Sequence, residues 1–243
     1  MRSVWAAILL CGVLLLPVGQ AVPTRAAQRL EISCADDLRA LSRRVSLGDS
    51  LFGQTVFLTQ DIDGMGYFLP IGSALHPFEG TFDGGGHTLS GLTVDGYLPC
   101  SGLFGCVGRA GTVRDLTLSD CLVSGRRYTG AVAGLCAGRM ERCAVQNSLV
   151  RSLDDAPDYA ATGALTGCLS GTLCLCEASA CSVDGPGHLG GLVGRLYVGG
   201  ARLCRFEGTV EGAPVRAAFS ARAESTPCSL PYPSGGTPEH PPF

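Results

Sequence analysis

Apolar residues recur along the middle of the chain in the order apolar, two others, apolar, one other, apolar. The pattern occurs five times, at Leu89-Leu92-Val94, Val113-Leu116-Leu118, Met140-Cys143-Val145, Leu173-Cys176-Ala178 and, in weaker form, Leu203-Phe206-Gly208. A four-residue motif with a final glycine precedes four of these units, at Gly102–Gly105, Ala131–Gly134, Ala164–Gly167 and Gly191–Gly194. Two motifs that recur in phase, roughly every 30 residues, indicate a repeat architecture.

The composition of each unit predicts the kind of repeat. Its apolar clusters are short and are bounded by glycine, serine and charged residues, which favours strands between turns. Helical repeats need longer apolar stripes, and 35 glycines among 243 residues oppose them. Short strands at this period fit a solenoid whose coils stack about 4.8 Å apart. The predicted fold is therefore all-β, a right-handed parallel β-helix.

A short N-terminal helix is predicted ahead of the repeats. Ser33 is the expected N-cap, and Gly48 is the expected stop. The apolar residues between them fall on one helical face, at Leu38, Leu41 and Val45. We expect this helix to cap the solenoid, because the end of a stack of coils would otherwise expose its core.

Three segments together resemble a known repeat family. Pro70–Gly72, Phe82–Thr88 and Gly102–Gly105 are similar to segments of GLUG-motif repeat proteins. The resemblance extends from Ile32 to Val210 and implies a secreted or surface-attached bacterial β-helix, of a type also found in IgA-cleaving metallopeptidases and adhesin-like chains. Phe68 replaces a tryptophan usual in the family, and the zinc-peptidase motif HExxH is absent. The resemblance therefore implies no protease activity.

The N-terminal residues predict export of the protein. Arg2 precedes an apolar run, Val4–Val18, which is too short for a membrane span and typical of a signal peptide, with cleavage after Ala21 or Ala26. No later segment is apolar enough to span a membrane, so the expected location is secreted or cell-surface associated. The predicted organisation is a signal peptide over 1–21, a linker over 22–31, the capping helix and first strand over 32–72, repeats over 73–213 and a proline-rich disordered tail over 214–243.

Charge narrows the possible partners. The net charge is −3, so no basic face favours nucleic acid. Hydrophobic residues make up 46% of the chain, enough for a core. The expected partners are a glycan or a host or cell-surface protein, and no cofactor is predicted.

The active site of a carbohydrate-cleaving β-helix needs two or three carboxylates, or carboxylates with a basic residue, on one strand face of adjacent coils, so these groups should share a column when the repeats are superimposed. The position after each first apolar residue holds Ser90, Arg114, Glu141, Cys174 and Cys204. No two carboxylates lie side by side in this column, and Glu141 approaches Asp115 only diagonally. Asp83–Gly86 is predicted to be a turn between strands rather than a phosphate loop, and His87 has no second ligand nearby. No catalytic residue and no metal ligand set is predicted.

One insertion is the candidate binding site. The longest interval between units carries Asp154, Asp155, Asp158 and Tyr159. Three carboxylates and an aromatic ring on a protruding loop suit Ca²⁺ or a sugar. The alternative is a solvated insertion without a ligand.

The cysteines predict cross-links between coils. Thirteen cysteines in an exported chain fall in an oxidising setting. The alignment gives Cys143 and Cys176 one shared inward position, and it gives Cys174 and Cys204 a shared outward position, each in consecutive coils. Stacked coils bring Cα atoms within the range that a disulfide accepts. An interior ladder of free thiols is the alternative. Cys106 and Cys168, and likewise Cys121 and Cys181, are expected to lie two coils apart.

The functional hypothesis is a secreted, non-enzymatic β-helix module that presents a binding or adhesion surface at or near the bacterial cell surface. Two alternatives stay open. One is a carbohydrate-active lyase or glycosidase with an unrecognised site. The other is a truncated fragment of a larger surface protein.

Overall fold

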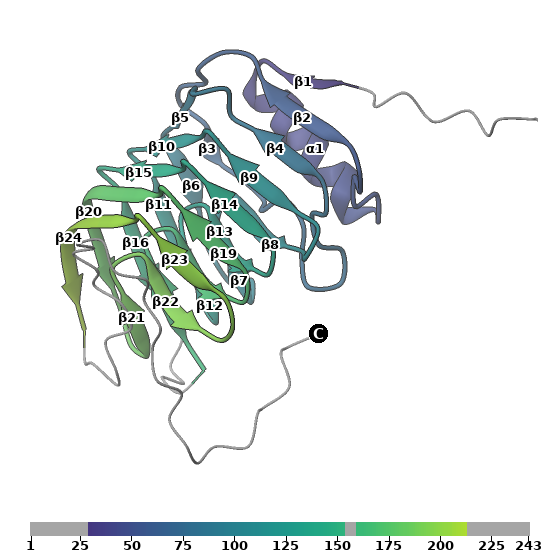
Figure 1. The fold of residues 1–243 in the computed structure, drawn as a ribbon. Coiled ribbons are helices and arrows are strands. Elements are labelled where there is room, and N and C mark those ends of the chain that lie inside the picture. Colours follow the sequence, from purple (N-terminus) through teal and green to yellow (C-terminus); the bar gives the residue numbers. More distant parts are fainter. Residues whose placement is uncertain (1–28, 154–158, 213–243) are drawn as a thin grey trace, which may run out of the picture.

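The structure is a computed structural model that describes residues 29–153 and 159–212. The predicted signal peptide, most of the linker, three acidic residues of the candidate loop and the tail lie outside these residues. The described part is a parallel β-solenoid with one short helix, α1 (Ala35–Ser46), as Figure 1 shows. The prediction of an all-β solenoid is confirmed, and the right-handed coil stays a prediction.

Sheet A runs the whole length of the stack. It contains seven parallel strands, in the order β1 (Leu30–Ile32), β2 (Thr55–Leu58), β4 (Thr81–Asp83), β9 (Thr112–Arg114), β14 (Arg139–Glu141), β19 (Thr172–Cys174) and β23 (Gly200–Arg202). Its first strand begins at Leu30, so the ladder starts before α1 and continues after it.

Sheet B consists of two parallel ladders joined by one long strand. One ladder contains β5 (Thr88–Ser90), β10 (Thr117–Ser119) and β15 (Ala144–Gln146), and the other contains β3 (Gly66–Tyr67), β6 (Leu92–Val94), β11 (Leu122–Gly125) and β16 (Leu149–Ser152). Both end on β20 (Glu177–Asp184), which also pairs with β24 (Arg205–Glu211).

Two four-stranded sheets complete four of the coils. Sheet C contains β8 (Phe104–Val107), β13 (Ala133–Cys136), β18 (Thr166–Leu169) and β22 (Val193–Leu196). Sheet D contains β7 (Cys100–Ser101), β12 (Tyr128–Thr129), β17 (Ala161–Gly163) and β21 (His188–Gly190).

The main core lies inside the coils. Alternate residues of each strand point inward, and the inward column of sheet A consists of Val56, Phe82, Val113, Met140, Leu173 and the smaller Ala201. Phe104 enters the same core from sheet C, where its ring centroid lies 5.1 Å from that of Phe78 and 5.5 Å from that of Phe82. These three rings are fully buried.

The final glycines of the four-residue motifs lie at close backbone approaches. A Cβ atom on Gly134 would lie 2.6 Å from the backbone nitrogen of Ser101, and one on Gly167 would lie 2.3 Å from that of Thr129. Real Cβ atoms do not approach backbone so closely, so sheets C and D can meet only where this position lacks a side chain.

Left-handed residues turn the chain from sheet A into sheet B. Asp115, Arg142, Leu175 and Leu203 occupy this corner in successive coils, with φ between 49° and 55°. A single residue in this conformation reverses which side of the chain faces inward, so the next residue is buried.

Two repeat alignments were wrong. The neighbour of Val113 is Phe82 rather than Leu89, because Leu89 pairs with Leu118 in sheet B. In the last coil, Leu173 pairs with Ala201 rather than Leu203. Leu203 is instead an exposed corner residue, which moves the last unit by two residues.

This shift also corrects one cysteine prediction. Cys174 lies opposite Arg202, so Cys174 and Cys204 do not share a position. Cys204 stacks on Cys176, because the registers on both sides of this corner place the two in line. The shared position of Cys143 and Cys176 is confirmed by the same argument. Leu135 separates Cys106 from Cys168, and Ser148 separates Cys121 from Cys181, as predicted.

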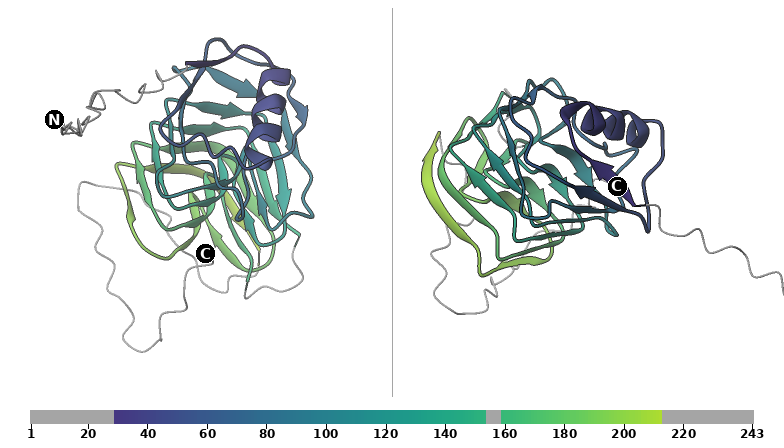
Figure 2. Two further views of the ribbon diagram at one scale, coloured as in Figure 1. Left: turned by 90° about the vertical axis from the view of Figure 1, so that its right-hand side faces the viewer. Right: turned by 90° about the horizontal axis from the view of Figure 1, so that it is seen from above.

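Helix α1 lies at the N-terminal end of the stack (Figures 1 and 2). Its apolar face, Leu38, Leu41 and Val45, is buried in the main core. The N-cap is Cys34 rather than Ser33, because the carboxylate of Asp37 accepts the backbone N–H groups of both residues, at 2.9 Å for Ser33 and 3.2 Å for Cys34. The capping role of the helix stays a prediction, tested below. Within the described ranges, α1 is too short to cross a membrane and no other helix is long or apolar enough.

Candidate functional site on the outer face of sheet A

The outward column of sheet A contains charged residues of opposite sign on neighbouring coils. It reads Asp83, Arg114, Glu141, Cys174 and Arg202, one residue from each of five consecutive strands. The corner column beside it contributes Asp115 and Arg142, and the first residue of β14 contributes Arg139. We call the six ionic residues Asp83, Arg114, Asp115, Arg139, Glu141 and Arg142 the charged strip.

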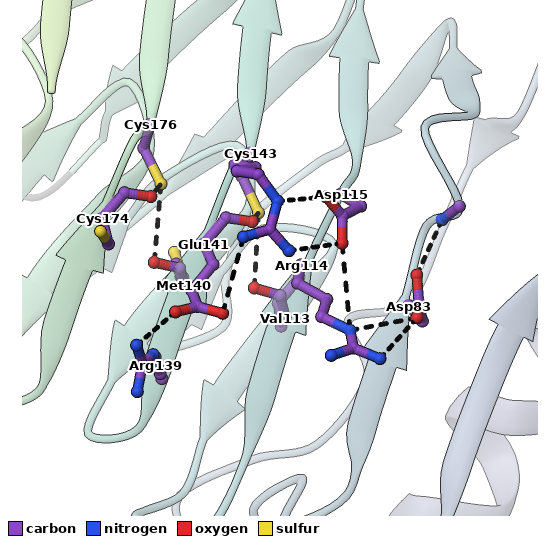
Figure 3. A network of polar contacts seen from close by, with 12 residues as sticks. Asp83, Val113, Arg114, Asp115, Arg139, Met140, Glu141, Cys143, Cys174 and Cys176 are labelled. Atoms are coloured by element: carbon purple, nitrogen blue, oxygen red, sulfur yellow. Dashed lines mark hydrogen bonds and ion pairs between the residues drawn. The ribbon is translucent and has the colours of Figure 1, made fainter. Parts of the chain in front are cut away.

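Ion pairs link the charged strip across three coils, as Figure 3 shows. The guanidinium of Arg114 donates to Oδ2 of Asp83 from Nη2 at 2.8 Å and from Nε at 3.0 Å. Arg142 donates to both carboxylate oxygens of Asp115, from Nε at 2.5 Å and from Nη2 at 2.8 Å. Arg139 contacts Glu141.

Weaker contacts join these pairs into one network. Nε of Arg114 lies 3.9 Å from Oδ2 of Asp115, and Nη1 of Arg142 lies 4.0 Å from Oε2 of Glu141. Each carboxylate therefore lies close to at least one guanidinium. Because the pairs Arg114–Asp83 and Arg142–Asp115 join different coils, they also favour the observed register.

The arginines are the outermost members of the charged strip. The side chain of Arg139 is 57% exposed, whereas those of Glu141 and Asp83 are only 18% and 15% exposed. The strip thus presents N–H donors to solvent and holds its carboxylates beneath them. Planar guanidinium groups suit carboxylate, sulfate and sugar oxygens as partners.

Pairing with arginine favours the ionised form of Asp115. The hydrogen bond from Arg142 lowers the pKa of Asp115, despite an opposing desolvation, and the same contact raises the pKa of Arg142. Outside the strip, the backbone N–H of Thr88 and the ring of His87 lower the pKa of Asp61. A general acid working near neutral pH needs a raised carboxyl pKa instead. In the described ranges, every carboxyl pKa that clearly departs from its ordinary value is lowered.

The aligned column from the sequence contained this strip only in part. Arg114 and Glu141 were placed correctly, but Asp83 takes the position assigned to Ser90, and Arg202 takes that assigned to Cys204. Two carboxylates therefore lie on either side of Arg114, which the alignment did not reveal. The sequence does contain a signal for the position of Asp83. The segments Thr81-Phe-Asp83 and Thr112-Val-Arg114 both consist of a threonine, an apolar residue and a charged residue, in that order.

Of the other predicted site residues, the described structure places Cys143 next to Cys176 in consecutive coils. Asp154, Asp155 and Asp158 lie outside the described residues, and Tyr159 is an exposed side chain at the edge of that gap. The eleven cysteines in the described ranges, which include Cys143, Cys174, Cys176 and Cys204, are all free thiols. Those ranges contain no group of three or more His, Cys, Asp or Glu side chains placed to hold a metal ion.

Comparisons with known proteins relate this chain to two others. No family profile matches it. Over 81 residues it is 37% identical to halomucin from Haloquadratum walsbyi, a match that covers 32% of this chain and 1% of halomucin. A crystal structure from Bacteroides ovatus, described as a putative immunoglobulin A1 protease, aligns with a TM-score of 0.48 and 19% identity, over 73% of this chain and 67% of that chain. The chain thus spans about one hundredth of the length of halomucin, and the similarity to GLUG-motif proteins remains a resemblance.

Proposed function

We propose that this protein is a secreted bacterial β-solenoid module, associated with the cell surface, that binds a glycan or a surface protein and catalyses no reaction. The observation that carries the proposal is the charged strip. Its carboxylates are each engaged by arginine, and its arginines face solvent. This arrangement offers a flat row of hydrogen-bond donors rather than an acid–base pair.

The same geometry argues against the carbohydrate-active alternative. Asp83 and Glu141 belong to strands β4 and β14, and β9 lies between them. Arg114 of β9 therefore occupies the position between the two carboxylates where a hydrolytic enzyme needs a water molecule and a glycosidic bond.

The shape of sheet A suits an extended ligand. The column beside Arg114 and Glu141 contains the partly exposed Thr81, Thr112 and Thr172, in register with Arg139. Hydroxyl and guanidinium donors then repeat at the coil spacing of about 4.8 Å. A repetitive chain such as a polysaccharide can contact several coils at once, which multiplies weak contacts.

Binding of the exported chain to a glycan array and to intact cells tests the proposal. We expect Arg139→Glu to reduce binding at least tenfold, because it reverses the most exposed charge of the strip. Arg151→Glu is the matched control, since Arg151 forms a similar cross-coil pair with Asp184, at 3.1 Å, on sheet B. An equal loss of binding in both variants would show that the charged strip is not the binding surface. Cleavage of a bound glycan would overturn the proposal and favour the enzymatic alternative.

A further inference from the structure

Three cysteines form a continuous column inside the solenoid. Cys143, Cys176 and Cys204 follow the corner residues of three consecutive coils, and the strand registers on both sides of the corner align them. All three are buried in the main core. Leu116 occupies the same position in the preceding coil. We call the three cysteines the thiol ladder.

The thiol ladder is the one place in the described ranges where cysteines stack without interruption. The other columns that hold two cysteines are broken by a different side chain, Leu135 between Cys106 and Cys168, and Ser148 between Cys121 and Cys181. Stacked coils lie about 4.8 Å apart, within the Cα separations of about 4.4–6.8 Å found across disulfides.

The thiols of the ladder lie next to one another in the column. The strand registers place Cys143 on one side of Cys176 and Cys204 on the other. Each thiol also donates to the carbonyl two residues earlier, at 3.5 Å for Cys143, 3.4 Å for Cys176 and 3.2 Å for Cys204. Cys176 is thus the middle member, within reach of two possible partners.

We propose that the thiol ladder is a disulfide site in which Cys176 bonds to one neighbour at a time, and in which Cys204 is the preferred partner and Cys143 the substitute. The oxidant is a small-molecule disulfide. One thiolate of the ladder attacks it, forming a mixed disulfide and releasing one small thiol. The second ladder thiolate then displaces the other small thiol. The net reaction converts two cysteine thiols and one small disulfide into one protein disulfide and two small thiols.

The position of Cys204 in the stack explains the preference. Its strands β23 and β24 pair with β19 and β20 on one side and with no later described strand. Leu203 beside it is exposed, and most of β24 faces solvent. By contrast, β14, which precedes Cys143, pairs on both sides. The coil of Cys204 is therefore the one that opens at least cost.

Oxidation of the thiol ladder is slow while the last coil stays folded. The contact with Cys143, together with burial, raises the pKa of Cys176 to about 12. The thiolate is the reactive form, and a raised pKa makes it scarce near neutral pH. Oxidation consequently requires folding or opening of the last coil, and a folded, reduced ladder stays reduced for long periods.

Disulfide mapping of the full chain tests the proposal. Reduced protein is exposed to oxidised glutathione, with and without mild urea, then alkylated and digested without reduction. Chymotrypsin cleaves after Leu175 and Leu203, and a glutamate-specific protease cleaves after Glu177. Together these cleavages separate the fragments of Cys176 and Cys204 from those of the other cysteines. We expect a Cys176–Cys204 linkage that forms at least tenfold faster in urea.

Single substitutions distinguish the preferred bond from chance oxidation. We expect Cys204→Ser to move the linkage to Cys143–Cys176, and Cys176→Ser to abolish both. Cys174→Ser, on the outer face, is the matched control and should leave the linkage unchanged. Oxidation should raise the melting midpoint by about 5–10 °C, since the bond closes a loop of one coil, and Cys176→Ser should show no such rise. Complete alkylation of Cys176 after oxidation in both conditions, or a linkage between Cys174 and Cys204, would overturn the proposal.

Discussion

Replacing Leu38 by aspartate tests whether α1 caps the solenoid. Leu38 is fully buried, and its side chain belongs to the same core as the first coils. Truncating such a leucine to alanine typically costs about 2–5 kcal/mol. A carboxylate adds the cost of leaving a charge without water or partner, so we expect the total for Leu38→Asp to reach about 5 kcal/mol.

A loss of this size is comparable to the whole stability of many domains, which is about 5–15 kcal/mol. The variant should therefore lose the docked helix, expose the end of the stack and aggregate. Leu41→Asp should behave alike, since Leu41 is also buried. Leu75→Asp is the matched control, because Leu75 is 86% exposed, and it should change stability by less than about 0.5 kcal/mol.

Urea unfolding followed by circular dichroism measures these differences. The single tryptophan is Trp5, inside the predicted signal peptide, so tyrosine fluorescence is the second probe. We expect a midpoint far below that of the parent protein for Leu38→Asp, and an unchanged midpoint for Leu75→Asp. If Leu38→Asp is soluble and unfolds at the same urea concentration as Leu75→Asp, the helix does not cover the core.

Three further predictions concern the coils. Circular dichroism of the exported chain should be dominated by strand, since α1 has only 12 residues, and a helical content above about one third would refute the solenoid. Gly167→Ala should lower the urea midpoint strongly, because its Cβ would lie 2.3 Å from a backbone nitrogen, whereas Gly200→Ala, with nothing within 4 Å, should change it little; equal effects would contradict the close approach of sheets C and D. Asp115→Asn should cost about 1 kcal/mol at pH 7. Because pairing lowers the folded pKa of Asp115 below its ordinary value of 3.8, the contribution is present above that value and lost as the pH falls through the folded pKa. A difference between variant and parent that does not shrink at all as the pH falls below 3.8 would contradict the ion pair.

The sequence carries the period of the fold clearly. Short apolar clusters predicted strands, and the amphipathic pattern of Leu38, Leu41 and Val45 predicted the helix, and the structure contains both. The final glycines of the four-residue motifs lie inside the strands of sheet C, where neighbouring backbones approach closely. These signals are local, because each reflects a constraint on one strand, one turn or one helical face.

The register at the two ends was harder to predict, for a physical reason. Strands of three residues with one inward side chain look alike in sheets A and B, so Leu89 of sheet B was taken for the equivalent of Val113 in sheet A. At the other end, Leu203 is an apolar residue that the left-handed corner places in solvent. Pattern alone does not separate an inward leucine from a corner leucine.

The same error obscured the site. Once Phe82 is recognised as the neighbour of Val113, Asp83 falls beside Arg114, and the charged strip becomes visible in the alignment. Pairing between specific charges is a tertiary property, since Arg142 and Asp115 lie 27 residues apart. Composition and net charge do not reveal which charged residues pair.

Recovery of a captured ligand tests the central claim most directly. Exported protein is immobilised and incubated with the glycan or surface protein that it retains in the binding assay, and the ligand is then eluted and weighed by mass spectrometry. We predict that the parent protein retains the ligand, that Arg139→Glu does not, and that the eluted ligand has an unchanged mass with no new reducing ends. Shortened or unsaturated products would contradict a non-enzymatic binding module.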